Sequence, residues 1–257
     1  MENNIDISIL MATRNPNPRY ICECLQSIDQ QTYRNFELVI VDDASDKVEV
    51  SDFLEGYDFP IQILRNEDQL GLAKSLNKGL KLARGKYIAR IDDDDIMLPT
   101  RLEKQYNYAQ THNGLIFSEV CLIDDEGQPI ASNGAGMKDT KRYLKRSGNC
   151  LTHSSLFVNR SILEKADGYD ERFVYAQDYA LYMKLIDTCD FFVLDETLVK
   201  YRVPANRSPR MKKILSLLSC YGASVNYFAS HKSMKNMFYF FRRSLSLLKS
   251  MYVYMRG

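Results

Sequence analysis

The sequence lacks several features that mark common classes of protein. No run approaches the ~18 uninterrupted apolar residues of a membrane-spanning helix. The six cysteines form no Cys-x-x-Cys pair and have no matching histidine spacing, so buried thiols in a reducing cytosol are expected, with a metal site at Cys22 and Cys24 as the alternative. The first four residues lack the basic and apolar regions of a signal peptide, and a cytoplasmic location is therefore expected.

Glycine-rich phosphate cradles are also absent. No Gly-x-Gly-x-x-Gly follows the first predicted strand, and there is no Walker lysine motif. These absences exclude the cradles of dinucleotide dehydrogenases and of P-loop ATPases. A sheet that binds a nucleotide diphosphate without such a cradle needs a cation to neutralise the phosphate charge.

Acidic residues are missing from positions 205–257, which contain ten basic residues. The whole chain of 257 residues has 34 Lys and Arg against 33 Asp and Glu, and its net charge of +1 hides this asymmetry. Removing the ten basic residues of the tail leaves 24 basic and 33 acidic residues in positions 1–204, a net charge of −9. An acidic body therefore precedes a basic tail.

The first hundred residues alternate short apolar strands with helical patterns, which predicts a parallel, doubly wound α/β sheet. Strands are expected at 6–12, 36–41, 61–64 and 87–91, and a helix at 71–83 ends before Gly85. After residue 99 the pattern predicts a mixed α/β half, with helices at 102–109 and 178–186, strands at 115–120, 155–158 and 191–194, and a loop at 132–145. We expect a catalytic domain over 1–204, with halves 1–98 and 99–204, and a basic helical tail over 205–257.

Three predicted strands end in polar residues, at 13–15, 42–45 and 92–95. Ligands of an open parallel sheet bind beyond the carboxyl ends of its strands. Four consecutive aspartates, Asp92–Asp95, repel one another unless a cation or buried donors compensate their charge. Mg²⁺ or Mn²⁺ takes oxygen ligands, so a divalent cation site is expected there. Helix capping at 42–43 and a solvated acidic turn at 92–95 are the structural alternatives.

Seven short blocks, in order along residues 5–204, resemble family 2 glycosyltransferases with the GT-A fold. The blocks are residues 8–15, 41–45, 85–96, 99–105, 153–155, 177–179 and 200–202. The resemblance implies an inverting enzyme that uses a UDP-sugar and Mn²⁺ or Mg²⁺. It also implies that Asp42 and Asp43 help to hold the uracil and ribose, with Ala12, Thr13 and Arg14 lining the base.

The later blocks imply the reacting groups. Asp92 and Asp94 match the DxD motif, with Asp92 nearer the ribose and Asp94 as the metal ligand, and Asp93 belongs to the same donor-binding run. Asp95 is expected to orient the donor sugar or a water on the metal. Asp178 matches the general base, and its place at the start of a helix predicts that the helix dipole keeps it ionised.

Two positions depart from the family pattern. Gln177 stands where the family has a glutamate before the base. Pro204 follows Val203 where many members have a histidine two residues after Tyr-Arg, so a third protein ligand to the metal is absent there. His153 is the speculative substitute, and a structural or acceptor-contacting role is the favoured interpretation of that residue.

The predicted function is transfer of a hexose to a saccharide or lipid-linked acceptor in bacterial lipopolysaccharide or capsule synthesis. Galactose and glucose are favoured as the hexose, and N-acetylglucosamine remains possible. One alternative is a catalytically inactive subunit that binds sugar nucleotides. Another is a phosphoacceptor receiver domain, which the length of the chain and the later blocks disfavour.

An apolar stripe in the tail predicts an amphipathic helix. The stripe consists of Phe238, Phe241, Leu245, Leu248 and Tyr252. Together with the basic residues it predicts peripheral attachment to an anionic membrane surface, at the inner face of the cytoplasmic membrane. Packing of the stripe on the catalytic domain is the alternative, and no nucleic-acid partner is expected.

Overall fold

The computed structural model describes residues 5–133, 139–147, 149–203, 210–231, 236–242 and 244–245. The strands are β1 (Ile7–Thr13), β2 (Phe36–Asp42), β3 (Ile61–Arg65), β4 (Tyr87–Arg90), β5 (Ile96–Met97), β6 (Gly114–Ile123), β7 (Pro129–Asn133), β8 (Phe157–Asn159) and β9 (Asp190–Arg202). The helices are α1 (Pro18–Asp29), α2 (Leu72–Leu82), α3 (Arg101–Ala109), α4 (Thr140–Ser147), α5 (Arg160–Lys165), α6 (Gln177–Leu185) and α7 (Arg210–Ser230), with short 3-10 turns at Val50–Phe53 and His153–Ser155.

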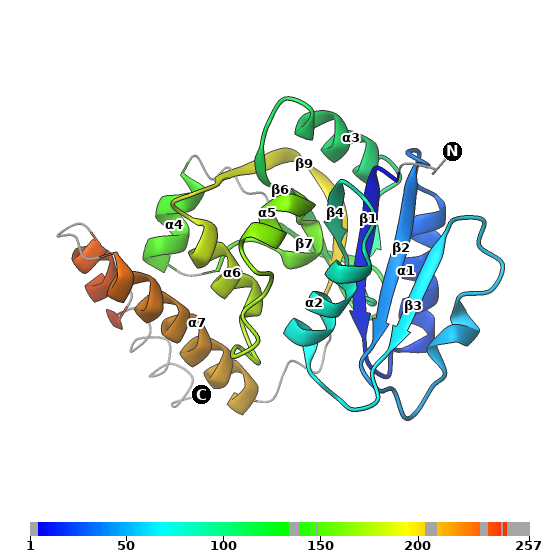
Figure 1. The fold of residues 1–257 in the computed structure, drawn as a ribbon, viewed down its shortest axis with the longest axis horizontal. Helices are drawn as coiled ribbons and strands as arrows, with labels where there is room; N and C mark the ends of the chain where they lie inside the picture. The colour runs from blue at the N-terminus through cyan, green and yellow to red at the C-terminus, as the bar shows by residue number, and fades with distance from the viewer. Residues whose placement is uncertain are drawn as a thin grey trace.

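One sheet runs through the molecule in the order β3-β2-β1-β4-β8-β6-β9-β5, and β7 pairs with β6 (Figure 1). The first four strands of this order are parallel, as the sequence predicted. β8 is antiparallel to both β4 and β6, and β6 and β9 are parallel to each other. The second half is therefore mixed, and it extends the sheet of the first half.

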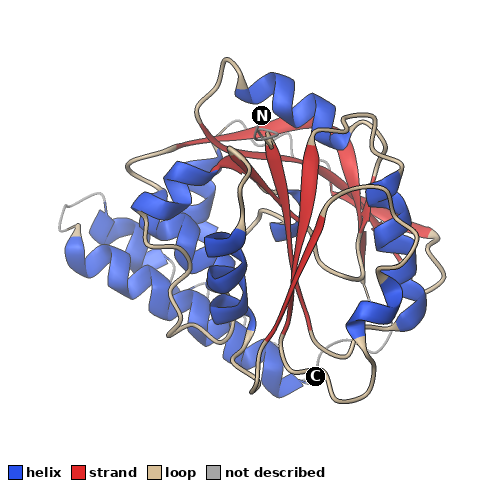
Figure 2. Cartoon of the chain, turned by 45° about the vertical axis from the view of Figure 1, so that its right-hand side comes forward, coloured by secondary structure: helices blue, strands red, loops and turns tan. Residues whose placement is uncertain are grey.

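Helices cover both faces of the sheet (Figure 2). Alternate residues of β1 enter two different cores, because side chains along a strand point to opposite faces. Ile9 and Met11 belong to the core that also contains residues of α1 and α3, whereas Leu10 belongs to the core that contains residues of α2, α6 and α7. This two-sided burial explains why β1 and β2 read as continuous apolar runs.

The predicted loop at 132–145 is wrong at both of its ends. β7 extends to Asn133, and α4 begins at Thr140. The late strand is also longer than expected, since β9 covers 13 residues and pairs with β6 as far as Arg202. The predicted strands and helices of the first hundred residues are otherwise confirmed to within a few residues.

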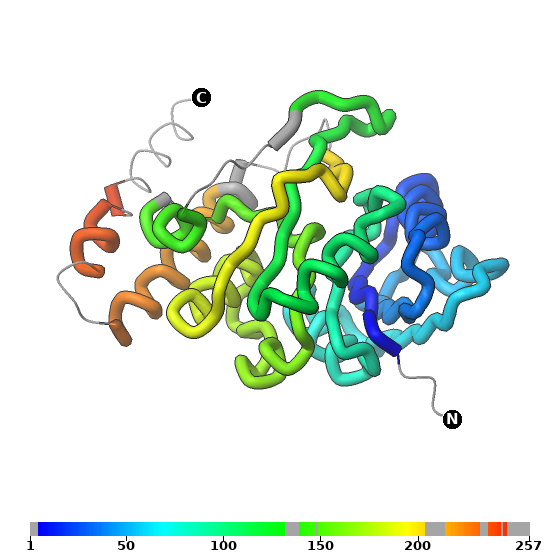
Figure 3. Tube along the Cα trace, turned by 90° about the horizontal axis from the view of Figure 1, so that it is seen from above, coloured from blue at the N-terminus to red at the C-terminus, as the bar shows by residue number. Residues whose placement is uncertain are grey.

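α7 lies at the opposite end of the molecule from β3 (Figure 3). Four of its residues, Cys220, Ala223, Tyr227 and Phe228, are buried in the core that also contains α6. Residues 236–242 form a further helical segment whose Tyr239 enters the same core. None of the helices in the described ranges is both long and apolar enough to cross a bilayer.

Candidate active site

The candidate site lies at the carboxyl ends of β1, β2 and β4. Strand order reverses at β1, because the chain runs from β1 outward to β2 and β3 and then returns to pair β4 on the other side. Such a reversal leaves a crevice where ligands of open α/β sheets bind. Hydrogen bonds join the three strand ends: the Asp43 N–H donates to the Thr13 carbonyl at 2.8 Å, and the Thr13 hydroxyl donates to Asp93.

Asp43 is held by protein donors rather than left open to a ligand. Its carboxylate accepts the Leu70 and Gly71 N–H groups at 2.8 Å each, the Asn66 amide at 2.8 Å and the Ser75 hydroxyl at 3.0 Å. Burial acts to raise the pKa of Asp43, but these donors lower it below the usual value. Asp43 therefore fastens the segment before α2, and Ser75 of α2 itself, to the end of β2.

The other residues predicted to hold the nucleoside lie near Asp43. Asp42 accepts the Ser45 N–H at 2.9 Å, and its second oxygen is buried without a hydrogen bond from any described residue, 3.3 Å from Arg65 Nη1. Ala12 is buried in the sheet, whereas the Arg14 side chain is 37% exposed. The structure thus brings the five residues predicted to hold the nucleoside to one edge.

Buried donors compensate two of the four aspartates that follow β4. Asp92 accepts hydrogen bonds from the Arg90 guanidinium and from the Ser154 hydroxyl, the latter at 2.8 Å. Burial acts to raise the pKa of Asp92, but the charge of Arg90 contributes to lowering it. Asp95 accepts the Arg202 N–H at 2.8 Å on Oδ1, and its Oδ2 is buried without a hydrogen-bond partner in the described part of the chain.

Three arginines are fully buried around the aspartate run, and the sequence analysis assigned them no role. Arg101 donates to the Arg90 carbonyl at 2.8 Å, and burial lowers its pKa to about 9. Arg202 donates from Nε to the Asp94 carbonyl at 3.0 Å and from Nη2 to Glu23. These guanidinium groups supply the internal positive charge that four clustered carboxylates require. An arginine inside an apolar strand, as Arg90 is in β4, was the available signal.

Asp94 is the least compensated member of the run. Its carboxylate receives no hydrogen bond from another described residue. Burial and the charges of Asp92 and Asp93 raise the pKa of Asp94 to about 7. A carboxylate without donors beside like charges fits a hard divalent cation. Among the described residues no three His, Cys, Asp or Glu side chains are grouped to surround a metal, so other oxygen ligands would be needed as well.

His153 is a buried structural residue. Its Nε2 lies 2.8 Å from the Tyr169 hydroxyl, and the two rings pack edge to face. Burial and the charge of Arg90 lower the pKa of His153 to about 3, so the imidazole is neutral at physiological pH. The ring nitrogen engaged by Tyr169 is not available as a substitute metal ligand, which agrees with the favoured interpretation.

Asp178 stands in the first turn of α6, and Ala176 before it has left-handed backbone angles, φ 57° and ψ 32°. The Asp178 carboxylate accepts the Tyr179 N–H at 2.7 Å and the Asn149 amide. Burial nevertheless raises the pKa of Asp178 above its usual value. A raised pKa makes the Asp178 carboxylate a stronger base, and its ionisation by the helix dipole stays a prediction.

Tyr201, on β9, lies within electrostatic range of both Asp178 and the aspartate run. Burial raises the pKa of Tyr201, and so do the negative charges of Asp95, Asp92, Asp94 and Asp178. Asp92 also contributes to the raised pKa of Asp178 itself. The two acidic groups that the sequence places far apart thus face one site.

The residue next to Asp178 is a junction between three helices. The Tyr179 hydroxyl lies 2.9 Å from the Leu144 carbonyl of α4 and 3.0 Å from the Ser224 hydroxyl of α7. Tyr179 is fully buried. The helix that begins at the candidate base is therefore fixed to both α4 and α7.

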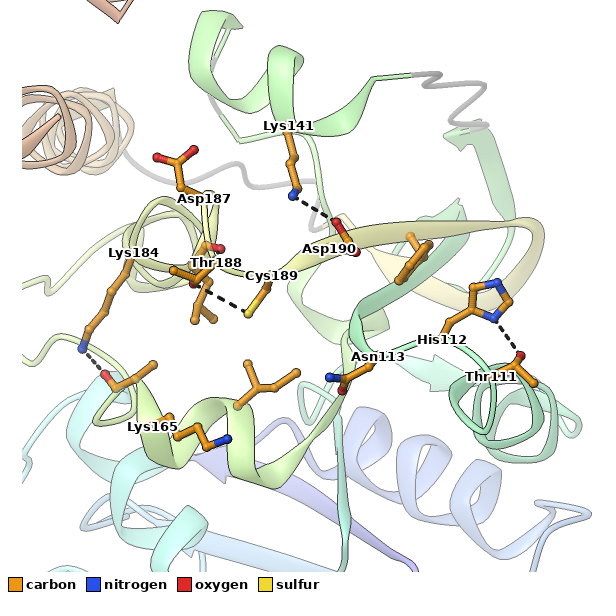
Figure 4. A pocket seen from close by; sticks show the side chains of 14 residues that line it. Thr111, His112, Asn113, Lys141, Lys165, Lys184, Asp187, Thr188, Cys189 and Asp190 are labelled. Carbon is orange, nitrogen blue, oxygen red and sulfur yellow. Dashed lines mark hydrogen bonds and ion pairs between the residues drawn. The ribbon is translucent and has the colours of Figure 1, made fainter. Parts of the chain in front are cut away.

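A cavity of about 980 Å³ lies away from these aspartates (Figure 4). Asn113, just before β6, and Asp190, the first residue of β9, both line this cavity. The cavity therefore lies at the amino ends of these strands, whereas the opposite, carboxyl end of β9 reaches Asp95. Lys141 spans part of it and pairs with Asp190 at 3.2 Å. The cavity contains no counterpart of the carboxylate run, so the strand-end crevice is the candidate active site.

Comparison with known proteins identifies the fold and the chain's relatives. Residues 8–166 match the model of glycosyl transferase family 2, and an uncharacterized glycosyltransferase of Methanocaldococcus jannaschii is 34% identical over 92% of this chain and 84% of its own length. The chain belongs to glycosyl transferase family 2. A second relative is the O-antigen biosynthesis glycosyltransferase WbnJ of Escherichia coli, which is 30% identical. The alignment covers 90% of this chain and 91% of WbnJ.

The family 2 fold is also confirmed by solved structures. The crystal structure of S. aureus TarS 1–349 in complex with UDP aligns with a TM-score of 0.66 at 19% identity. The alignment covers 86% of this chain and 66% of that one. The expected GT-A architecture is therefore confirmed, and the chain is a glycosyltransferase.

Proposed function

We propose that this glycosyltransferase moves a hexose from a UDP-sugar to a hydroxyl of a saccharide or lipid-linked acceptor, with inversion at the anomeric carbon. The observation that carries the proposal is that Asp94, which accepts no hydrogen bond from another described residue, and the half-buried Asp178 both act on Tyr201 through their charges. One carboxylate suits a cation on the diphosphate, and the other suits a proton acceptor on the opposite side of the sugar.

The donor would be held along the strand-end crevice. Ala12, Thr13, Arg14 and Asp42 line its nucleoside side, and the orphaned Asp42 oxygen is an acceptor that the nucleoside could satisfy. Asp43 would act by fixing the loop before α2. On the sugar side, Asp92, Asp93 and Asp95 are fixed by protein donors, and these donors give the crevice a defined shape.

Asp94 would hold Mn²⁺ or Mg²⁺ together with oxygens of the diphosphate. Such an ion supplies neutralisation of the charge that develops on the departing UDP. The Asp94 carboxylate is left for this role, since the Arg90 guanidinium binds Asp92 and the Arg202 N–H binds Asp95.

Asp178 would accept the proton of the attacking hydroxyl. The acceptor oxygen forms its bond to the anomeric carbon, the bond from that carbon to the UDP oxygen breaks, and the proton passes to the Asp178 carboxylate. A carboxylate with a raised pKa is the stronger base, which favours proton transfer in concert with attack. Asn149 and the Tyr179 N–H hold the carboxylate in place.

Relatives support the choice of a UDP-hexose and of a surface glycan. A relative that is 28% identical is named UDP-Glc:alpha-D-GlcNAc-diphosphoundecaprenol beta-1,3-glucosyltransferase WfgD, and AmsE and WbnJ carry names of amylovoran and O-antigen biosynthesis. TarS has also been crystallised with UDP-GlcNAc. Galactose and glucose remain our preferred donors, and bacterial lipopolysaccharide or capsule synthesis the preferred setting.

A donor panel tests the proposal. UDP-galactose, UDP-glucose and UDP-N-acetylglucosamine are incubated with Mn²⁺ or Mg²⁺ and an undecaprenyl diphosphate-linked saccharide, and UDP release and product anomer are measured. One donor should turn over with inversion, and both EDTA and Asp94→Ala should reduce the rate by about 10²-fold or more.

Three outcomes would contradict parts of the proposal. Full activity in EDTA would show that the reaction does not require a metal. A retained anomeric configuration would rule out a single displacement. Binding of UDP-sugars with no turnover on any acceptor would instead support the inactive sugar-nucleotide-binding subunit.

A further inference from the structure

An exposed apolar stripe runs along the helical segment that follows α7. The side chains of Met237, Phe238, Phe241 and Leu245 are 61%, 59%, 68% and 56% exposed. Phe238, Phe241 and Leu245 are three and four residues apart, so they share one helical face. The opposite face is buried, because Tyr239 enters the core. The structure thus places the described part of the predicted stripe outward, and Leu248 and Tyr252 lie outside the described residues.

A basic helix lies beside this stripe. Lys141, Arg142 and Lys145 of α4 line a cavity of about 450 Å³ together with Asp139, Asn236 and Tyr239. α4 itself contains four basic residues and no acidic one within Thr140–Ser147. Two of them already have partners, since Lys141 pairs with Asp190 and Lys145 with Asp187.

The remaining charges of α4 are available to an external anion. Arg142 is exposed and Arg146 partly so, and neither makes an ion pair with a described residue. Tyr143, between them, is 45% exposed. An aromatic flanked by arginines suits an interface between water and lipid, where the ring and the charged groups sit at the headgroup level.

We propose that α4 and the exposed face of residues 236–242 and 244–245 form one docking surface for an anionic lipid bilayer. The apolar stripe would enter the boundary between headgroups and acyl chains, and Arg142, Arg146 and Arg242 would contact lipid phosphates. Charge complementarity favours lipid over a second copy of this chain, because the tail has ten basic residues and no acidic one to pair with itself.

This surface is linked to the candidate active site. Tyr179, beside Asp178, bonds to Leu144 on the buried side of α4 and to Ser224 of α7. Docking would therefore hold the base side of the site at a fixed position relative to the membrane. This consequence rests on the proposed function, whereas the docking itself does not.

Vesicle flotation with the full-length protein tests the docking. Vesicles of phosphatidylcholine with about one third phosphatidylglycerol are compared with pure phosphatidylcholine, at low and high salt. We expect binding to the anionic vesicles at low salt and at least 10-fold weaker binding to the neutral ones. Phe238→Ser with Phe241→Ser, and separately Arg142→Gln with Arg146→Gln, should each weaken binding by about 10-fold or more.

Matched variants provide the controls. Ile63→Ser removes an exposed apolar residue of β3, and Lys81→Gln with Lys165→Gln removes two exposed charges of α2 and α5. Both should bind like the wild type, and circular dichroism melting should show every variant folded. Equal binding by the docking variants, or no binding by the wild type, would overturn the proposal. A wild-type dimer in light scattering that Phe238→Ser with Phe241→Ser converts to monomer would assign the surface to a second copy.

Turnover separates this proposal from the proposed function. The docking variants should keep the wild-type rate of UDP release with a soluble saccharide acceptor, since neither pair of residues belongs to the active site. Vesicle binding without turnover on any donor would sink the proposed function and leave the docking intact.

Discussion

At the scale of single residues, Asp178 carries the sharpest test of the chemistry. Asp178→Asn keeps the shape and the Tyr179 contact but removes the proton acceptor. We expect turnover to fall by ~10²–10⁴-fold while UDP affinity changes little, as measured by steady-state kinetics and calorimetry.

The control for this variant is Asp167→Asn. Asp167 has left-handed backbone angles that asparagine also tolerates, and it lies outside the site. Its activity should match the wild type. If Asp178→Asn retained more than about a third of the wild-type rate, a general-base role would be wrong.

Single residues also mark the limit of what the sequence could predict. The identity of the acidic residues and their position at strand ends were predictable, because polar groups interrupt apolar runs there. Which of them bind protein donors and which stay open to a ligand could not be predicted. The Asp43 carboxylate accepts hydrogen bonds from three donors of the loop before α2 and from Ser75 of α2, and only the folded chain brings those donors together. Arg101 reaches the Arg90 carbonyl by the same tertiary route.

At the scale of secondary-structure elements, Gly85 fixes the approach of β4 to β1. A Cβ on Gly85 would lie 2.4 Å from the Ser8 nitrogen and 2.6 Å from the Ile7 carbonyl carbon, which are backbone atoms that cannot move aside. Gly85→Ala should therefore cost about 1–3 kcal/mol of the free energy of unfolding, measured by urea denaturation.

Gly222 of α7 is the matched control for Gly85. A Cβ there meets only Phe173 Cε1, at the ordinary contact distance of 3.8 Å. Gly222→Ala should stabilise the protein by about 0.5–1 kcal/mol, because alanine has the higher helix propensity. A Gly85→Ala variant as stable as the wild type would show that β1 and β4 can separate without cost.

The elements that the sequence missed are those held by tertiary contacts. Leu144 is the one fully buried side chain among the described residues of α4, so the segment has no clear apolar period. Lys145 anchors α4 instead, through Asp187 and the face of Tyr227. β9 was underestimated for a similar reason. Its polar second half is held by pairing with β6 across register shifts near Glu119.

At the scale of the whole molecule, α7 is part of the catalytic body. Its buried side chains lie in the core together with those of α6, while Phe238, Phe241 and Leu245, the described residues of the apolar stripe, are exposed. The charge asymmetry could predict a distinct tail, but not which apolar residues turn inward, since both helical faces contain them.

Truncation after Val203 should consequently destabilise the protein. It removes five apolar side chains that are at most 8% exposed: Cys220, Ala223, Tyr227, Phe228 and Tyr239. Burial of a large apolar side chain contributes about 1.5–3 kcal/mol, so the melting temperature should fall by roughly 10 °C or more. Differential scanning calorimetry measures the change. A truncated chain that melts with the full-length one would mean that α7 contributes nothing to the core.

The Tyr179 junction has a consequence for motion. A residue bonded to α4 and α7 at once cannot shift without breaking both contacts, and Asp178 precedes it in the same turn. We therefore expect the proposed proton acceptor to keep its position while the acceptor binds. Any adjustment that brings hydroxyl and carboxylate into line falls to the incoming acceptor, so acceptors with a rotatable hydroxyl should be accommodated more readily than rigid ones.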